Sequence, residues 1–384
     1  MFTRSLYLLA FLSGFAALVY QVAWAKMLSL SFGSSTLGVS SVVAGFLGGM
    51  GIGAWLYRRV SDRGVAALRI YSALEVGIAL STAGFTLLFR LLPGLFAATA
   101  EALPAGLAMD AFRVASAIIL LLIPSALMGA TYPALCTALI HTRRGVERHL
   151  GWVYGFNTLG GAAGAMVAGL AMIELLGSSG AVLFANAMNM IVAVSALLMA
   201  RGRTRAGRAA GASVSDESLP SELPVWLTGI VLFASGFTTL GYEIVWFRAL
   251  RYLVGNGTYV LTNVLVIFLL GLGFGGFFYR AALRLGRAES NLALCQLGIS
   301  ILALLAIGCE QLVLTTPWLR DQLSIFSVEF RSHSWPWRLG VSSALSLAIM
   351  LPATLWMGLS FPLASRLFLG SVRALGARVG LAYL

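Results

Sequence analysis

Two glutamates stand inside apolar runs of the sequence, where a charge is hardest to accommodate. Glu243 lies in the apolar run at 225–252. Glu75 lies roughly 10 residues into the run that starts near 66, which at about 1.5 Å per residue puts it close to the middle of a membrane. Charges at membrane depth are costly and are therefore functional candidates. A buried carboxyl either takes up a proton or keeps a cation beside it, so the sequence predicts a site for a proton or an amine.

Glutamines occupy the matching positions of an internal repeat that is described below. Gln21 aligns with Glu243, and Gln296 aligns with Glu75, so each half has one Glu and one Gln at equivalent places. Aromatic residues lie within a helical turn of Gln21 and Glu243, and the face of an aromatic ring attracts a cation. The predicted substrate-binding set is Glu75, Glu243, Gln21, Gln296, Tyr20, Tyr242, Trp24 and Trp246.

Structural roles explain the same residues without a ligand. The two glutamates would then bond to neighbouring helices, Glu243 for instance to Lys26 or Arg248, and only hold the bundle together. The aromatic residues would form the belt that Trp and Tyr make at membrane interfaces. Both alternatives stay open at the level of the sequence.

A conformational latch is predicted at Asp62 and Arg63. The stretch from Gly53 to Gly64 resembles the cytoplasmic loop between the second and third helices of major-facilitator proteins, where Asp and Arg hold neighbouring helices together in one state. The second copy of the repeat keeps the basic residues but has no matching Asp. Membrane orientation alone also explains the arginines.

The composition is that of a membrane protein. Of 384 residues, 59% are hydrophobic and 10% are charged, with a mean hydropathy of +0.90, whereas soluble domains have roughly 45–50% and about 25%. The net charge of +12 comes mostly from arginines in short clusters between apolar runs, as positive-inside orientation requires. We therefore expect the lipid bilayer as a partner and no nucleic acid. The three cysteines and three histidines lack metal-ligand spacing, so we expect neither a metal nor a cofactor.

The chain divides into predicted membrane spans according to the length of its apolar runs and the Arg, Gly and Pro residues that separate them. The spans are near 5–30, 36–57, 66–90, 113–140, 150–175 and 179–200, then near 225–252, 258–279, 291–315 and 339–367, with another beginning near 376. We predict a first membrane repeat at 1–200, a linker rich in Arg, Ser and Gly at 201–223, and a second membrane repeat at 224–384. Because arginines are far more frequent on the side of the N-terminus and the linker, we expect that side to be cytoplasmic.

The repeat is a direct alignment of residues 13–58 with residues 235–280. A second anchor aligns MGATYP at 128–133 with MGLSFP at 357–362. Each copy is expected to contain six spans. Because six is an even number, both copies enter the membrane from the same side, like the halves of major-facilitator transporters. We expect an all-α polytopic protein of two parallel six-helix repeats. The second repeat is incomplete, as in a fragment of a longer protein.

Glycine runs at 49–53 and 271–276 superficially look like phosphate-binding loops. Such loops need a preceding strand and a helix N-terminus that faces the phosphate. Both runs lie inside predicted spans, so we interpret them as places where helix backbones approach closely.

Five segments of the chain, taken together, form a pattern that is specific enough to indicate a protein family. They are SGFAALVYQVAW, FGSSTLGVSSVVAGFLGGMGIGAWL, IYSALEVGIAL, PSALMGATYPAL and VYGFNTLGGAAGA. Together they resemble the membrane domain of the bacterial fused spermidine synthase-like family, and the resemblance covers essentially the whole chain. In that family a polytopic, major-facilitator-like domain precedes a cytoplasmic aminopropyltransferase domain. The resemblance implies a bacterial inner-membrane protein with an enzyme domain downstream. It assigns aminopropyl transfer to no residue of this chain.

Two functions follow as expectations. In the first, the domain recognises or translocates a small cationic substrate such as a polyamine between the repeats. In the second, it is a non-transporting anchor for an enzyme domain or a scaffold subunit of a larger membrane complex. A water-filled cavity lined by Glu75 would favour the first function, and tight packing between the halves would favour the second.

Overall fold

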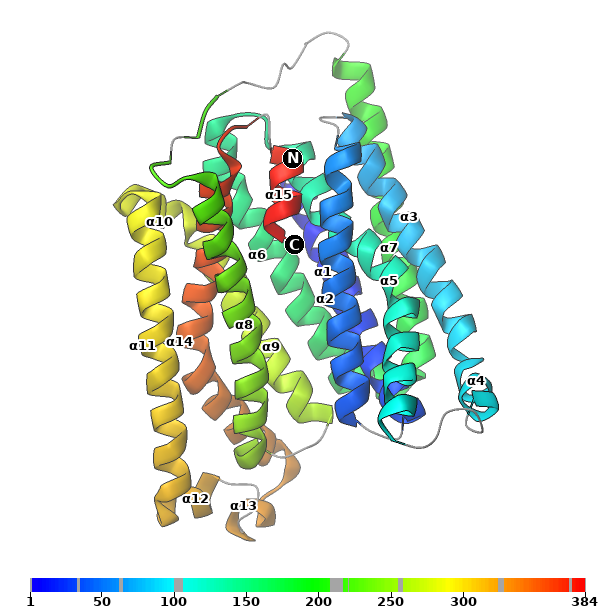
Figure 1. Ribbon diagram of the computed structural model, residues 1–384, viewed down its shortest axis with the longest axis vertical. Helices are drawn as coiled ribbons and strands as arrows, with labels where there is room; N and C mark the ends of the chain where they lie inside the picture. The colour runs from blue at the N-terminus through cyan, green and yellow to red at the C-terminus, as the bar shows by residue number, and fades with distance from the viewer. Residues whose placement is uncertain are drawn as a thin grey trace.

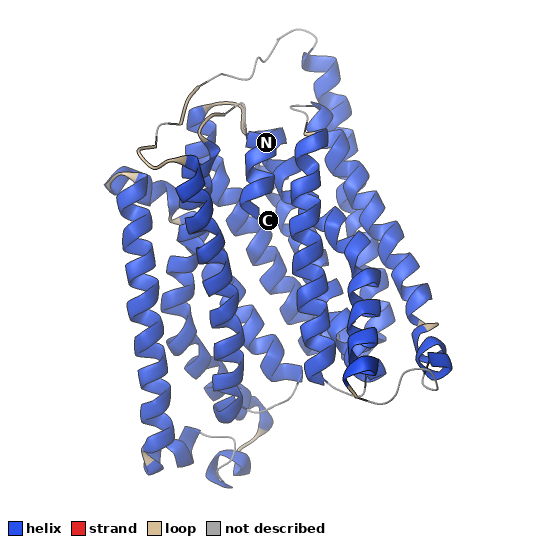
Figure 2. Ribbon diagram, in the orientation of Figure 1, coloured by secondary structure: helices blue, strands red, loops and turns tan. Residues whose placement is uncertain are grey.

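The computed structural model describes residues 2–32, 35–61, 65–99, 106–207, 217–219, 221–254, 258–323, 328–372 and 375–383. Within these ranges the chain is almost entirely helical (Figure 2). The β-type pairing within the same ranges is an isolated antiparallel bridge between Ser218 and Ser371. The prediction of an all-α protein is confirmed for the described residues.

Long helices run side by side along the long axis of the molecule (Figure 1). They are α1 (Phe2–Phe32), α2 (Ser35–Val60), α3 (Val65–Phe89), α5 (Leu107–Leu139), α6 (Arg143–Val167), α7 (Ile173–Gly207), α8 (Val225–Val254), α9 (Thr258–Phe277), α11 (Ala288–Thr315) and α14 (Trp335–Leu369). Shorter helices are α4 (Leu92–Thr99), α10 (Tyr279–Leu285), α12 (Pro317–Leu323), α13 (Val328–Ser332) and α15 (Leu375–Tyr383). The long helices fall on the predicted spans, and α7 continues beyond residue 200 into the predicted linker.

Seven helices of the described chain are long and apolar enough to cross a membrane, and the bent pair α9–α10 would make an eighth. One of the seven is the stretch Arg143–Gly202, which contains α6, a π-helical turn η1 (Ala168–Met172) and α7. Inside it the chain bends at Gly177, where φ is 69° and ψ is 169°. Only glycine adopts this conformation without strain, which explains the sharp boundary between the predicted spans 150–175 and 179–200. These helices are those of a multi-pass membrane protein.

The two ends of the bundle differ in chemistry. One end holds the N-terminus, the end of α7, the start of α8, α10 and α15, and the opposite end holds α4, α12 and α13 (Figure 1). Basic residues lie at the first end: Arg58 and Arg59 close α2, Arg143 opens α6 and Arg366 lies near the end of α14. We call this end the linker end. The spatial separation matches the uneven distribution of arginines that the sequence predicts.

Glycines let the helices approach to backbone contact. Along α2 and α5, a side chain on Gly53 would collide with the carbonyl oxygen of Ala126, and a side chain on Gly129 would collide with that of Met50. The contact recurs at the aligned positions of α9 and α14, where Gly275 faces the carbonyl oxygen of Leu355 and Gly358 faces that of Leu272. Lipid tails are as apolar as the helix surfaces, so close packing of this kind is what holds membrane helices together.

We expect Gly53→Ala to destabilise the fold by about 1–3 kcal/mol, because the added methyl group forces α2 away from the backbone of α5. The matched control is Gly48→Ala on the same helix, since Gly48 has no atom within 4 Å of the added carbon. Thermal unfolding of both variants in one detergent measures the effect. Equal melting temperatures for the two variants would contradict the packing role of Gly53.

Candidate functional site

Glu75 lies on α3 and is fully buried against α1. The Ser13 hydroxyl of α1 donates a hydrogen bond of 2.6 Å to Oε1 of Glu75. The other carboxyl oxygen, Oε2, is buried and has no hydrogen-bond partner among the described residues. The residue therefore joins two helices, and its Oε2 makes no hydrogen bond within the described chain although the Tyr71 hydroxyl of the same helix lies beside the carboxyl group.

A neutral version of this bond joins α8 and α11. The Gln296 amide donates a hydrogen bond of 2.7 Å to the hydroxyl of Ser235. Ser235 aligns with Ser13, and Gln296 aligns with Glu75. The same helix pairing is thus made once with a carboxyl group and once with an amide, so it does not depend on a negative charge.

A chain of polar side chains continues from this region between α1, α3 and α7. Tyr20 donates a 2.6 Å hydrogen bond to Oδ1 of Asn186, and Thr82 donates a 2.5 Å bond to the same oxygen. Asn189 donates a 3.2 Å bond to the Tyr20 hydroxyl, and its own buried Oδ1 has no hydrogen-bond partner among the described residues. Tyr20 belongs to the set predicted from the sequence, whereas Thr82, Asn186 and Asn189 do not. The available signal was a pair of asparagines at helical spacing within an apolar run.

A cavity of about 20 Å³ lies beside this polar chain. Roughly 10–15 Å³ is the least volume that holds one water molecule, so the cavity is too small for a polyamine chain. Glu75 does not line the cavity, although its hydrogen-bond donor Ser13 does. The lining residues are Ser13, Ala17, Met50, Ile78, Met128, Thr131, Tyr132, Asn157 and Asn189.

The predicted aromatic residues pack on one another. The ring centroids of Tyr20 and Trp24 lie 5.4 Å apart in a stack, and those of Tyr242 and Trp246 lie 5.5 Å apart. Trp24 and Trp246 are both fully buried. Each meets a phenylalanine edge to face with 6.4 Å between centroids, Phe46 and Phe268 respectively. In this conformation protein atoms surround both indole rings, so neither is open to a cation or to lipid headgroups.

Other predicted site residues stay apart from this network. Gln21 and Glu243 are each half-buried, on α1 and α8. Helices α3 and α8 stand on opposite sides of the bundle (Figure 1), so Glu75 and Glu243 are not brought together. No ion pair between Glu243 and Lys26 is present in the described part of the chain. The predicted latch, Asp62 and Arg63, lies outside the described residues.

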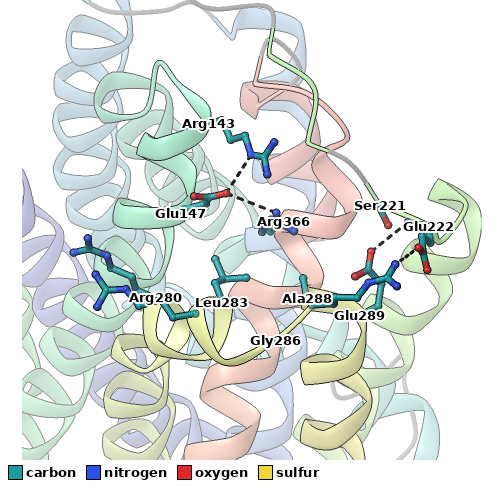
Figure 3. Close-up of a pocket in the computed structure, with 12 residues that line it drawn as sticks. Arg143, Glu147, Ser221, Glu222, Arg280, Leu283, Gly286, Ala288, Glu289 and Arg366 are labelled. Atoms are coloured by element: carbon teal, nitrogen blue, oxygen red, sulfur yellow. Dashed lines mark hydrogen bonds and ion pairs between the residues drawn. The ribbon is translucent and has the colours of Figure 1, made fainter.

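A wider cavity, about 540 Å³, opens at the linker end (Figure 3). At one side Glu147 of α6 lies 3.2 Å from Arg143 and 3.8 Å from Arg366 of α14. At the other side Glu222 forms an ion pair with Arg287, and its hydrogen bond raises the pKa of that guanidinium. The sequence explains these arginines by membrane orientation only and does not predict that they gather around a cavity.

No protein-family model matches the chain, and no curated protein sequence matches it. The resemblance to the spermidine synthase-like family therefore stays a prediction from the residues.

We expect Ser13→Ala to destabilise the protein by about 1–3 kcal/mol, because it removes the described hydrogen bond to a buried carboxyl group. Glu75→Gln is expected to cost less, since an amide makes the same helix contact at Gln296. Thermal unfolding compares both with the control Ser81→Ala, whose hydroxyl bonds only to its own helix at Ile78. If Glu75→Gln lowers the melting temperature as much as Ser13→Ala does, the carboxyl group of Glu75 is itself needed for stability, and its equivalence to the amide of Gln296 is wrong.

Proposed function

We propose that the chain is a membrane domain of two parallel, major-facilitator-like repeats. The support is an exchange of contacts between the halves. Helix α6 packs on α9, where a side chain on Gly151 would collide with the carbonyl oxygen of Gly276. Helix α15 packs on α2, where a side chain on Gly380 would collide with the carbonyl oxygen of Ala54. Since Gly380 aligns with Gly151 and Ala54 aligns with Gly276, one rotation that exchanges the repeats also exchanges these contacts.

The linker end is the cytoplasmic end in this proposal, and the membrane is the bacterial inner membrane. The gathering of arginines at the linker end supports the orientation, because basic residues are retained on the cytoplasmic side. The location follows from the resemblance stated above. The N-terminus and the predicted linker at 201–223 then both face the cytoplasm.

The function that the geometry supports best is that of a closely packed membrane anchor or scaffold. The observation that carries it is the packing around Glu75. The carboxyl group is sealed, the adjacent cavity has room for about one water molecule, and the neutral Gln296 makes the equivalent bond. Under the resemblance, the partner of the anchor is an aminopropyltransferase-like domain on the cytoplasmic side.

Recognition or translocation of a small cation, such as a polyamine, is the second candidate. Oε2 of Glu75 and Oδ1 of Asn189 are buried acceptors without a partner among the described residues. Buried acceptors of this kind attract a proton or a cation. A carrier would have to open this region to one side of the membrane, and Glu75 would then meet the substrate.

Thiol labelling distinguishes the two functions. In a background where Cys136, Cys295 and Cys309 are replaced, we expect Asn157→Cys to resist a membrane-impermeant maleimide from either side, because Asn157 lines the small inner cavity, which is too small to admit the reagent. The controls Leu107→Cys and Arg284→Cys, exposed at opposite ends of the bundle, should each react from one side.

Uptake measurements complete this test. Proteoliposomes of the purified full chain are expected to accumulate labelled spermidine no faster than empty liposomes. Labelling of the Asn157→Cys variant from both sides, together with saturable uptake that Glu75→Gln abolishes, would contradict the anchor function and establish the carrier function.

A further inference from the structure

The linker-end cavity is assembled from elements of both halves and the linker. It lies between the start of α6, helix α10, the start of α11 and the end of α14, with residues 221 and 222 at its rim (Figure 3). Its volume of about 540 Å³ falls within the roughly 300–1,000 Å³ of small-molecule sites. It thus has room for a ligand that the inner cavity excludes.

The charge of the cavity lining is predominantly positive. Its basic members are Arg143, Arg280, Arg284, Arg287 and Arg366, and its acidic members are Glu147, Glu222 and Glu289. Among the described residues, Arg143, Arg287 and Arg366 form ion pairs, whereas Arg280 and Arg284 have no carboxylate partner. A polyamine would be repelled here, and an anion would be attracted.

Arg366 separates this cavity from an ordinary basic surface. The residue is only 8% exposed, and its Nε is buried without a hydrogen-bond partner among the described residues. Its nearest acidic atom, on Glu147, is 3.8 Å away, which is beyond hydrogen-bonding distance. Membrane orientation explains arginines that reach water, but it does not explain a buried guanidinium whose Nε donor is unused. Such donors are costly unless an acceptor meets them.

We propose that the linker-end cavity binds a phosphate-bearing anion, with Arg366 at its base and Arg280 and Arg284 at its wall. Guanidinium groups hold phosphate oxygens by paired, charge-assisted hydrogen bonds, which a single ammonium group cannot do. The ligand is either a phosphorylated solute or the headgroup of an anionic phospholipid, since the cavity lies at the end of the membrane helices. This site is separate from Glu75 and from the anchor function.

Pyrophosphate and phosphatidylglycerol are the two probes, applied to the purified full chain. Calorimetric titration measures the affinity of the protein for pyrophosphate, which stands for a phosphorylated solute. Native mass spectrometry of nanodiscs that contain equal phosphatidylglycerol and phosphatidylcholine measures the retention of phosphatidylglycerol, which stands for a lipid headgroup. We expect one of them to bind, and we expect Arg284→Gln and Arg366→Gln each to weaken that binding at least tenfold. Arg366→Lys, which keeps the charge but loses the paired donors, should also weaken it.

Arg69→Gln is the matched control, because Arg69 is an exposed arginine near the start of α3 and does not line the cavity. It should leave the affinity unchanged. Arg284 is exposed, so its variant reports on binding even if Arg366→Gln fails to fold. Pyrophosphate binding identifies a phosphorylated solute, and selective retention of phosphatidylglycerol identifies a lipid headgroup. Binding of neither probe, or binding that Arg69→Gln and Arg284→Gln reduce equally, overturns the proposal.

Discussion

Contact between helix backbones at glycine is the interaction on which the rest of this structure depends. In lipid there is no hydrophobic gain when two apolar helices meet, so association relies on close packing and on polar bonds between helices. Gly53 of α2, Gly129 of α5, Gly275 of α9 and Gly358 of α14 bring main chains together where any side chain would collide with a carbonyl oxygen. The same device joins α6 to α9 and α15 to α2. Helices that approach so closely leave little interior volume, which is why the cavity beside Ser13 is so small.

Polar residues in this interior serve the packing first. Ser13 with Glu75, and Ser235 with Gln296, make the same bond between corresponding helices with opposite directions of donation. A carboxyl group and an amide are similar in shape, so either fits between the helices. The carboxyl group differs in leaving an acceptor that its surroundings do not satisfy. A carboxyl group at that point is tolerable only if it is protonated or meets a cation, so Glu75 makes this position chemically different from its counterpart in the second repeat.

The helical architecture was predictable from the sequence because apolar length is a strong signal in a membrane protein. Packing of the glycine runs was predictable too, since both runs stand inside apolar spans. Which side chains form hydrogen bonds between helices was harder to predict from the sequence. Asn186 and Asn189 lie over 100 residues from Tyr20 in the chain, and no local pattern indicates which helix they face. The arginines around the linker-end cavity stand in separate short clusters along the sequence, and only the folded chain shows that Arg143, Arg284 and Arg366 line one cavity.

The turn at Gly177 has a consequence for how the protein enters its membrane. Between Arg143 and Gly202 the chain is helical apart from this turn, and no arginine or lysine lies between Arg148 and Arg201 to hold a loop at the far surface. Basic residues stand at both outer ends of the stretch, which are at the linker end of the bundle. With the linker end on the cytoplasmic side, as proposed above, α6 and α7 form one helical hairpin whose two ends both lie in the cytoplasm and whose small tip, with Glu174 as its charged residue, is the part that has to cross the bilayer.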